Sequence, residues 1–136
     1  SEKNLAKAMA RMTAAFATAT VPKVNIIIGN AYGSASVMMN SKSIGADLVY
    51  AWEGSKMGMM DAAMAAKIMY EDKGSDVIAQ KAKEYEELQS SVFTAARRGL
   101  VDLIISPADT RKYAVAAFEM LYTKGIGEPT KKHAAK

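Results

Sequence analysis

The stretch that decides the fold is Val21-Pro-Lys-Val-Asn-Ile-Ile-Ile-Gly-Asn-Ala-Tyr-Gly-Ser-Ala-Ser-Val-Met-Met-Asn-Ser-Lys42. Residues 24–28 are mostly β-branched and apolar, which predicts a buried strand. The small residues from Gly29 to Ala35 predict a turn that leaves the backbone nearly bare. A helix that begins at Ser34 or Ala35 has unpaired N–H groups in its first turn, and its dipole adds positive potential there. Such a turn can stabilise an oxyanion without a catalytic side chain.

Hydrophobic periodicity and helix-end signals predict the other elements. An apolar stripe with spacings of three and four predicts a helix over residues 4–19, which ends before Pro22. Asp61, Ser75 and Ser106 are typical N-cap residues, and Gly74 is placed as a C-cap glycine. The remaining predicted helices cover residues 35–42, 61–71, 75–92 and 106–125, and the remaining predicted strands cover residues 48–52 and 101–105, with an extended piece at 56–60.

Two of these helices have a predicted inward face. The apolar positions of the helix that begins at Ser75 recur at helical spacing, as do those of the last helix. We therefore expect both faces to point toward the interior of the protein. The inward positions are Ile78, Ala82, Tyr85, Leu88 and Val92 in the former and Ala114, Phe118, Leu121 and Tyr122 in the latter.

Strands that alternate with helices predict an α/β layered fold with parallel strands flanked by helices. Three convincing strands are few for a complete sheet. An open apolar sheet edge associates with other chains. The sequence therefore predicts a homodimer or a higher homo-oligomer.

The bulk properties limit the function classes. The 136 residues, half of them hydrophobic, predict one core-forming domain at residues 1–125, followed by a basic tail at 126–136. The net charge of +4 includes no continuous basic face with stacking aromatics, which argues against nucleic-acid binding. With no cysteine and no apolar stretch of bilayer length, we expect a soluble cytoplasmic protein without a membrane span. Scattered carboxylates and a single histidine, His133, predict no metal site.

Four motifs lie in a fixed order along nearly the whole chain. They are Ala31-Tyr-Gly-Ser-Ala35, Ile44-Gly-Ala-Asp-Leu-Val-Tyr-Ala-Trp52, Ala95-Ala-Arg-Arg-Gly-Leu-Val-Asp102 and Pro129-Thr-Lys-Lys-His133. Together they resemble the C-terminal crotonase-type domain of the carboxyltransferase (beta) subunit of biotin-dependent acyl-CoA carboxylases. The resemblance implies a crotonase-like layered fold that is incomplete here, because the family's first domain and the first strands of its second domain are not present.

The resemblance also implies a reaction and its partners. The family moves a carboxyl group between carboxybiotin and an acyl-CoA, here of the acetyl- or propionyl-CoA class. The implied cofactor is biotin on a biotin carboxyl carrier protein, with CoA as part of the substrate. The other implied partner is a second carboxyltransferase domain or subunit, which completes the active site. On this basis we expect the isolated chain to be inactive.

The site residues follow from the same resemblance. The family's biotin-side oxyanion hole falls on the backbone N–H groups of Ser34 and Ala35, and its position for acyl-chain selection falls on Val37. Where this chain has Ser34 and Ser36, the family usually has a glycine and an aromatic residue. The oxyanion hole can form with serine at position 34 if Ser34 is helical, since a helical serine needs no positive φ. The expected pocket comprises Gly33, Ser36, Val37, Met57 and Gly58.

Several alternatives remain open at this stage. The chain also resembles the decarboxylase subunit of sodium-pumping complexes that act on methylmalonyl-CoA or glutaconyl-CoA. It is alternatively a non-catalytic module for oligomerisation or for docking the biotin carrier, or its glycine turn serves packing alone. A nucleophilic Ser34 is disfavoured, because Tyr32 occupies a flanking position that a nucleophile elbow keeps small. Arg97 and Arg98 either bind a CoA phosphate or complement a helix end or a carboxylate.

Overall fold

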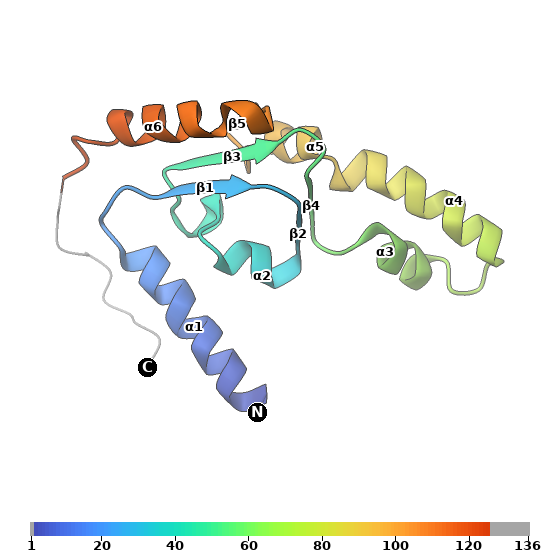
Figure 1. The fold of residues 1–136 in the computed structure, drawn as a ribbon. Helices are drawn as coiled ribbons and strands as arrows, with labels where there is room; N and C mark the ends of the chain where they lie inside the picture. The colour runs from blue at the N-terminus through green and yellow to red at the C-terminus, as the bar shows by residue number, and fades with distance from the viewer. Residues whose placement is uncertain (1, 126–136) are drawn as a thin grey trace.

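The computed structural model describes residues 2–125, and parallel strands flanked by helices form an α/β fold, as the sequence predicts (Figure 1). The helices are α1 (Glu2–Thr18), α2 (Gly33–Met38), α3 (Ala62–Met69), α4 (Ser75–Tyr85), α5 (Val92–Arg97) and α6 (Thr110–Met120). Short 3₁₀ turns occupy Lys42–Ile44 and Pro107–Asp109, and a π-helical turn occupies Glu86–Ser90. The strands are β1 (Val24–Ile27), β2 (Asn30–Tyr32), β3 (Leu48–Trp52), β4 (Lys56–Gly58) and β5 (Leu103–Ile105).

The strands form two small parallel sheets that meet at a corner. The central sheet has the order β1-β3-β5, with Val24 opposite Leu48 and Tyr50 opposite Leu103. Past the ends of β1 and β3 the chain turns and pairs again as β2 and β4, which run in a different direction (Figure 1). The Lys56 N–H donates to the Gly29 carbonyl at 3.2 Å and joins the two segments of the chain at the corner.

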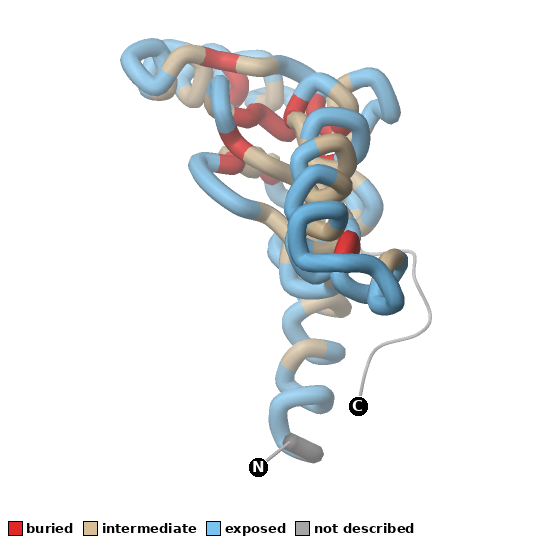
Figure 2. The backbone as a smooth tube through the Cα atoms, turned by 90° about the vertical axis from the view of Figure 1, so that its right-hand side faces the viewer, coloured by how far each residue is buried: buried red, intermediate tan, exposed pale blue. Residues whose placement is uncertain are grey.

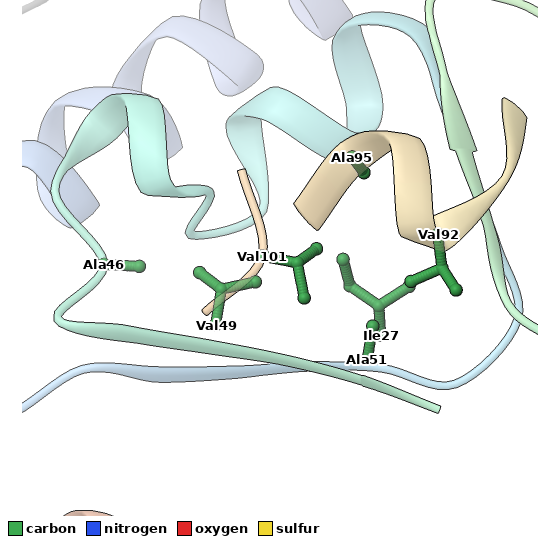
Figure 3. Packing of buried hydrophobic residues seen from close by; sticks show 7 residues of the cluster. All are labelled: Ile27, Ala46, Val49, Ala51, Val92, Ala95 and Val101. Carbon is green, nitrogen blue, oxygen red and sulfur yellow. The ribbon is translucent and has the colours of Figure 1, made fainter. Parts of the chain in front are cut away.

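The core lies on both faces of the central sheet. Successive strand residues point to opposite faces, so Val49 and Ala51 face α5 while Tyr50 faces α6. Figure 3 shows the first side, where Val49 and Ala51 pack with aliphatic side chains from β1, α5 and the loop before β5. On the second side, the rings of Tyr50 and Tyr113 meet edge to face at 5.9 Å, and Ala117 is fully buried. The helices therefore fix the sheet from both sides.

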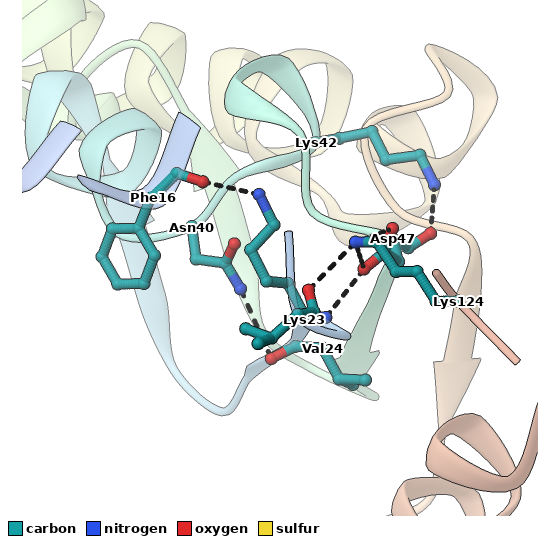
Figure 4. Close-up of polar contacts among 8 residues, drawn as sticks. Phe16, Lys23, Val24, Asn40, Lys42, Asp47 and Lys124 are labelled. Carbon is teal, nitrogen blue, oxygen red and sulfur yellow. Dashed lines mark hydrogen bonds and ion pairs between the residues drawn. The ribbon is translucent and has the colours of Figure 1, made fainter. Parts of the chain in front are cut away.

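A charged network holds the N-terminal ends of β1 and β3 together (Figure 4). The Asp47 carboxylate accepts from the Lys23 N–H at 2.7 Å and forms an ion pair with Lys124 at 2.7 Å. Lys23 is itself buried, and its ammonium donates to the Phe16 carbonyl at the end of α1. Burial by itself raises the pKa of Asp47, but the hydrogen bonds and charges of Lys124 and Lys23 outweigh it and hold the pKa below its ordinary value.

The glycine turn contains an element that the sequence prediction missed. Residues 30–32 form β2, whereas we expected an irregular turn there. The predicted helix over residues 35–42 is also wrong in length, because α2 ends at Met38. Asn40 has a left-handed backbone with φ +56°, which ends the helix. Its side chain donates to the Val24 carbonyl at 3.5 Å and Asn25 donates to its carbonyl at 2.9 Å, so the turn is fastened to β1.

The predicted helix boundaries between residues 61 and 99 are partly wrong. Asp61 caps α3 as predicted, accepting from two N–H groups of the first turn. Gly74, expected as a C-cap, is the N-cap residue of α4 with an extended backbone, and Ser75 is the first helical residue rather than the cap. The helix expected to continue to Val92 is interrupted by the π-helical turn and by an extended Ser91, which bridges to Lys56 in β4. Leu88, expected to face inward, is therefore exposed.

The inward face of α6 differs from the prediction. Ala117 is the buried position and Tyr113 packs beside it, whereas Phe118 and Tyr122 are 52% and 87% exposed. Both faces have apolar residues four apart, so spacing alone does not choose between them. The helix ends at Met120 rather than near residue 125, and Ser106 makes no side-chain cap bond. The predicted basic tail at 126–136 lies outside the described residues.

Much apolar surface remains exposed in the described part of the chain. Figure 2 shows α1 as a largely exposed helix that extends away from the buried segments. Leu5, on its predicted apolar stripe, is 62% exposed. On α3, Met64 and Ile68 are similarly exposed. Within residues 2–125, no helix is both long and apolar enough to cross a bilayer.

The replacement Asp47→Asn tests the charged network. The folded pKa lies below the unfolded value of about 3.9, so the carboxylate stabilises the fold above that pH, and this contribution is lost as pH falls through the folded pKa. We expect the variant to lose about 1–2 kcal/mol of unfolding free energy at pH 7. It should also lose stability less steeply than the parent below about pH 4. Urea denaturation across pH measures both effects.

Asp72→Asn is the matched control, because Asp72 is exposed and has no hydrogen bond or ion pair among the described residues. An Asp47→Asn variant as stable as this control at pH 7 contradicts the role given to the network.

Candidate functional site

The pairing of β2 with β4 positions the predicted site residues. Tyr32 lies opposite Gly58, so α2 begins beside the end of β4. Residues that are 25 positions apart in the sequence, such as Gly33 and Gly58, thereby line one pocket. The short strands thus bring the glycine turn and the Met57-Gly58 step together.

Gly33 sets the entry into α2. Its backbone is left-handed with φ +64°, and an added Cβ would lie 3.4 Å from the Met59 carbonyl oxygen. Regular helical backbone follows from Ser34, which has no positive φ. Ser34 is therefore helical, which is the condition under which a serine needs no positive φ at this position. The Ser36 hydroxyl donates to the Gly33 carbonyl at 2.8 Å and closes the first turn.

A pocket of about 200 Å³ lies between α2, β4 and α5. All five residues predicted for the pocket line it, and Arg98, Gln89 and Leu100 complete its other side. Ser34 and Ala35 lie beside it in the first turn of α2, and Ala35 faces an adjoining cavity of about 370 Å³ between α2 and β1. The two cavities share Ser36, Ser41, Lys42, Met57 and Leu100.

The first turn of α2 supplies donors without intrahelical acceptors. The first four N–H groups of any helix lack such acceptors, and in α2 these include the N–H groups of Ser34 and Ala35. With only six residues, α2 has a small dipole. The predicted contribution of the dipole is thus minor, and the donors themselves are what the turn offers to an anion.

The pocket lining is cationic. Lys42 and Arg98 line the 200 Å³ pocket, and no Asp or Glu is among its lining residues in the described chain. The hydrogen-bond donors of Lys42 are already used, because its ammonium donates to both Asp102 oxygens at 2.7 and 2.8 Å and to the Asp47 carbonyl at 3.1 Å. Arg98 donates to the side-chain oxygen of Gln89, a neutral partner.

Tyr32 does not supply an acid–base group near neutral pH. Burial raises the pKa of the Tyr32 phenol above its ordinary value, Asp61 and Glu86 raise it further, and only Lys56 opposes them. Lys56 is paired with Glu86. Tyr32 therefore stays protonated at pH 7. Within residues 2–125 we find no group of three or more histidine or acidic residues arranged to bind a metal ion.

Sequence reasoning did not place Gln89 in the pocket and left Arg98 between two roles. Gln89 enters because the π-helical turn changes the direction of the chain before α5. The sequence carries no clear signal for such a turn, since good helix-forming residues flank it. Arg98 follows Ala95 by three positions, which places both on one face of α5. Ala95 is buried in the core and also lines the pocket.

Comparison with known proteins identifies the family. Residues 1–135 match the carboxyl transferase domain family. The chain belongs to this family. The resemblance seen in the four sequence motifs is therefore confirmed.

Individual members of the family are similar in sequence to this chain. The chain is 39% identical over 130 residues to the methylmalonyl-CoA carboxyltransferase 12S subunit of Propionibacterium freudenreichii subsp. shermanii. It is 44% identical over 130 residues to a putative propionyl-CoA carboxylase beta chain of Bacillus subtilis (strain 168). Each match covers 91% of this chain, but only 25% and 26% of the relative. The chain thus spans about a quarter of the length of these relatives.

Solved structures confirm the crotonase-like fold. A crystal structure of transcarboxylase 12S, with methylmalonyl-coenzyme A and methylmalonic acid bound, superimposes with a TM-score of 0.89 at 36% identity. It covers 98% of this chain and 26% of the other. The beta subunit of geranyl-CoA carboxylase from P. aeruginosa has the same fold, with a TM-score of 0.78 at 21% identity over 98% of this chain and 27% of that one.

The replacement Gly33→Ala tests the turn. An alanine at φ +64° is strained, so we expect a loss of about 1–2 kcal/mol in unfolding free energy. Gly29→Ala is the matched control, since Gly29 has no positive φ and an added Cβ meets no atom within 4 Å. We expect the control to stay within about 0.5 kcal/mol of the parent. Equal losses in the two variants, measured by urea denaturation, would show that φ at Gly33 is not the constraint.

Proposed function

We propose that this chain is the biotin-side half of a carboxyltransferase active site, which moves a carboxyl group between biotin and a short acyl-CoA. The observation that carries the proposal is the position of the α2 first turn beside the pocket of Gly33, Ser36, Val37, Met57 and Gly58, in a chain of the carboxyl transferase family. The relatives named for propionyl-CoA and methylmalonyl-CoA support a short acyl group.

The pocket suits a flat ureido ring. Its walls at Gly33, Ser36 and Gly58 are small, Val37 and Met57 supply apolar surface, and the first turn of α2 lies beside it. Biotin on a carrier protein supplies the ureido group that gives up or accepts the carboxyl group. In the proposal, the Ser34 and Ala35 N–H groups donate hydrogen bonds to the oxygen on which negative charge develops. One such donor contributes about 3–4 kcal/mol to transition-state stabilisation.

In this proposal the remaining lining residues bind the substrate and exclude water from it. Val37 and Met57 add apolar surface beside the backbone donors, and hydrogen bonds from such donors are stronger where water is excluded. Ser36 stands where the family usually has an aromatic residue, so the pocket is wider at that point. No described side chain of the pocket is a carboxylate or a histidine, which accords with a mechanism that needs no protein base.

We further propose that the active site is completed by another carboxyltransferase domain or subunit, in a homo-oligomer that receives a biotin carboxyl carrier protein. The chain covers a quarter of its relatives, and the structure of one relative is described as a hexamer assembly. The exposed apolar surfaces of α1, α3 and α6 support extensive contacts with further protein. On this proposal the isolated chain has little activity, and robust carboxyl transfer from malonyl-CoA to biotin by the chain alone would contradict it.

A second reaction within the family is supported by two relatives. The methylmalonyl-CoA decarboxylase alpha subunits of Veillonella parvula and Propionigenium modestum are 41% and 42% identical to this chain. These values fall within the range of the carboxylase relatives, so identity does not separate the reactions. A neighbouring gene for a membrane pump subunit, with decarboxylation that depends on sodium ions, would favour the decarboxylase.

The replacement Ala35→Pro tests the oxyanion role. Proline removes one proposed donor, and we expect transfer of the carboxyl group to biotin to fall about 100- to 1000-fold in the assembled full-length gene product. Asp76→Pro is the matched control, because it also places proline in the first turn of an exposed helix, α4, away from the pocket.

Circular dichroism and light scattering must show the fold and assembly of both variants to be intact. If an assembled Ala35→Pro variant transfers carboxyl groups as fast as the control, the N–H group is not needed. The chain would then be better described as a non-catalytic oligomerisation or carrier-docking module.

A further inference from the structure

Arg98 is the one cation of the 200 Å³ pocket whose charge no described carboxylate neutralises. Lys42 uses all three of its N–H donors on Asp102 and the Asp47 carbonyl. A guanidinium has five N–H donors, and one of those of Arg98 is used, on the neutral amide oxygen of Gln89. The planar guanidinium therefore keeps the donors that bind a carboxylate in a bidentate manner.

The surrounding chain holds this guanidinium at the pocket. Arg98 follows the last residue of α5, and Gly99 with φ +76° ends the helix directly after it. Ala95, one turn earlier, is buried in the core and fixes the helix. Gln89 lies beside the fully buried Ser90 in the π-helical turn, a feature that frequently marks functional sites. Both partners thus project from anchored backbone.

We propose that Arg98 binds the carboxylate of the group being transferred, with Gln89 as its positioning residue. The inference rests on the proposed function, since it assigns the carboxylate of a malonyl- or methylmalonyl-type acyl-CoA to the rim of the same pocket. In the described chain, Arg98 is the lining cation that is not paired with a carboxylate, and no Asp or Glu lines the pocket to compete for it. Among the described residues, Arg98 has no carboxylate partner, and its hydrogen bond goes to the side chain of Gln89 instead.

Arg98 acts in binding rather than in bond breaking. A cation beside a carboxylate stabilises the charged ground state, and this stabilisation is lost as negative charge leaves the carboxyl group. Its removal is therefore expected to raise KM for the carboxylated substrate without lowering kcat.

The test uses the assembled full-length gene product and three exposed positions. Arg98→Gln removes the charge. Gln89→Glu keeps the shape and the hydrogen bond but neutralises the guanidinium with a carboxylate. Arg97→Gln is the matched control, since Arg97 is the adjacent exposed arginine and does not line the pocket.

The probes are malonyl-CoA and acetyl-CoA, which differ by the carboxylate. We expect both Arg98→Gln and Gln89→Glu to weaken malonyl-CoA binding by about tenfold, measured by calorimetry and as KM, and to leave acetyl-CoA binding unchanged. The Arg97→Gln control should bind both probes as the parent does. The malonyl-CoA effect should shrink with added salt, because exposed charges are screened.

Three outcomes would overturn the assignment. Equal weakening of malonyl-CoA and acetyl-CoA would show that Arg98 binds a CoA phosphate. Unchanged binding of both would show that the guanidinium serves the fold alone, and equal effects of Arg97→Gln would show a general charge effect. Binding is measured without turnover, so a parent protein that binds malonyl-CoA through Arg98 but transfers no carboxyl group would refute the proposed function alone, and Arg98 would remain the residue that binds the malonyl carboxylate.

Discussion

The whole candidate site is positioned by one corner of the structure. There the chain leaves the central sheet after β1 and after β3, and the two segments pair again as β2 and β4. The five residues predicted for the pocket, which include Gly33 and Gly58, line it together because these two three-residue strands run in parallel and end together. The corner depends in turn on the core that packs against both faces of β3, and on the network around Asp47 that fixes the start of β1 and β3. The chemistry proposed for the pocket therefore relies on contacts that lie away from it.

Local signals predicted much of the fold. The apolar strand at residues 48–52 and the Asp61 cap are determined by nearby residues, and both were predicted correctly. β2 was missed because a three-residue strand has too short a pattern, and its existence depends on pairing with β4. The buried face of α6 was assigned wrongly because Tyr113 and Ala117 have the same spacing as Ala114 and Phe118, and only the position of the sheet chooses between them.

The candidate site was predictable to a different extent. Small residues around Gly33 indicated an exposed backbone, but the grouping with Met57 and Gly58 came from the family resemblance rather than from any pattern in the chain. The position of Gln89 in the pocket could not be predicted from the sequence, since the π-helical turn that carries Gln89 depends on the burial of Ser90 and on the bridge from Ser91 to β4. The resulting pocket combines small residues, apolar side chains and a guanidinium.

The parallel pairing of all the described strands has a consequence for how the chain folds. Within residues 2–125 no hairpin connects two paired strands, so Val24 must find Leu48 and Tyr50 must find Leu103 across long intervening segments. Closing such loops precedes the gain from pairing and slows folding. Helices α3 and α4 are sequence neighbours and pack mainly on each other. They are therefore expected to be ordered early, while the sheet and the pocket beyond its corner are completed last.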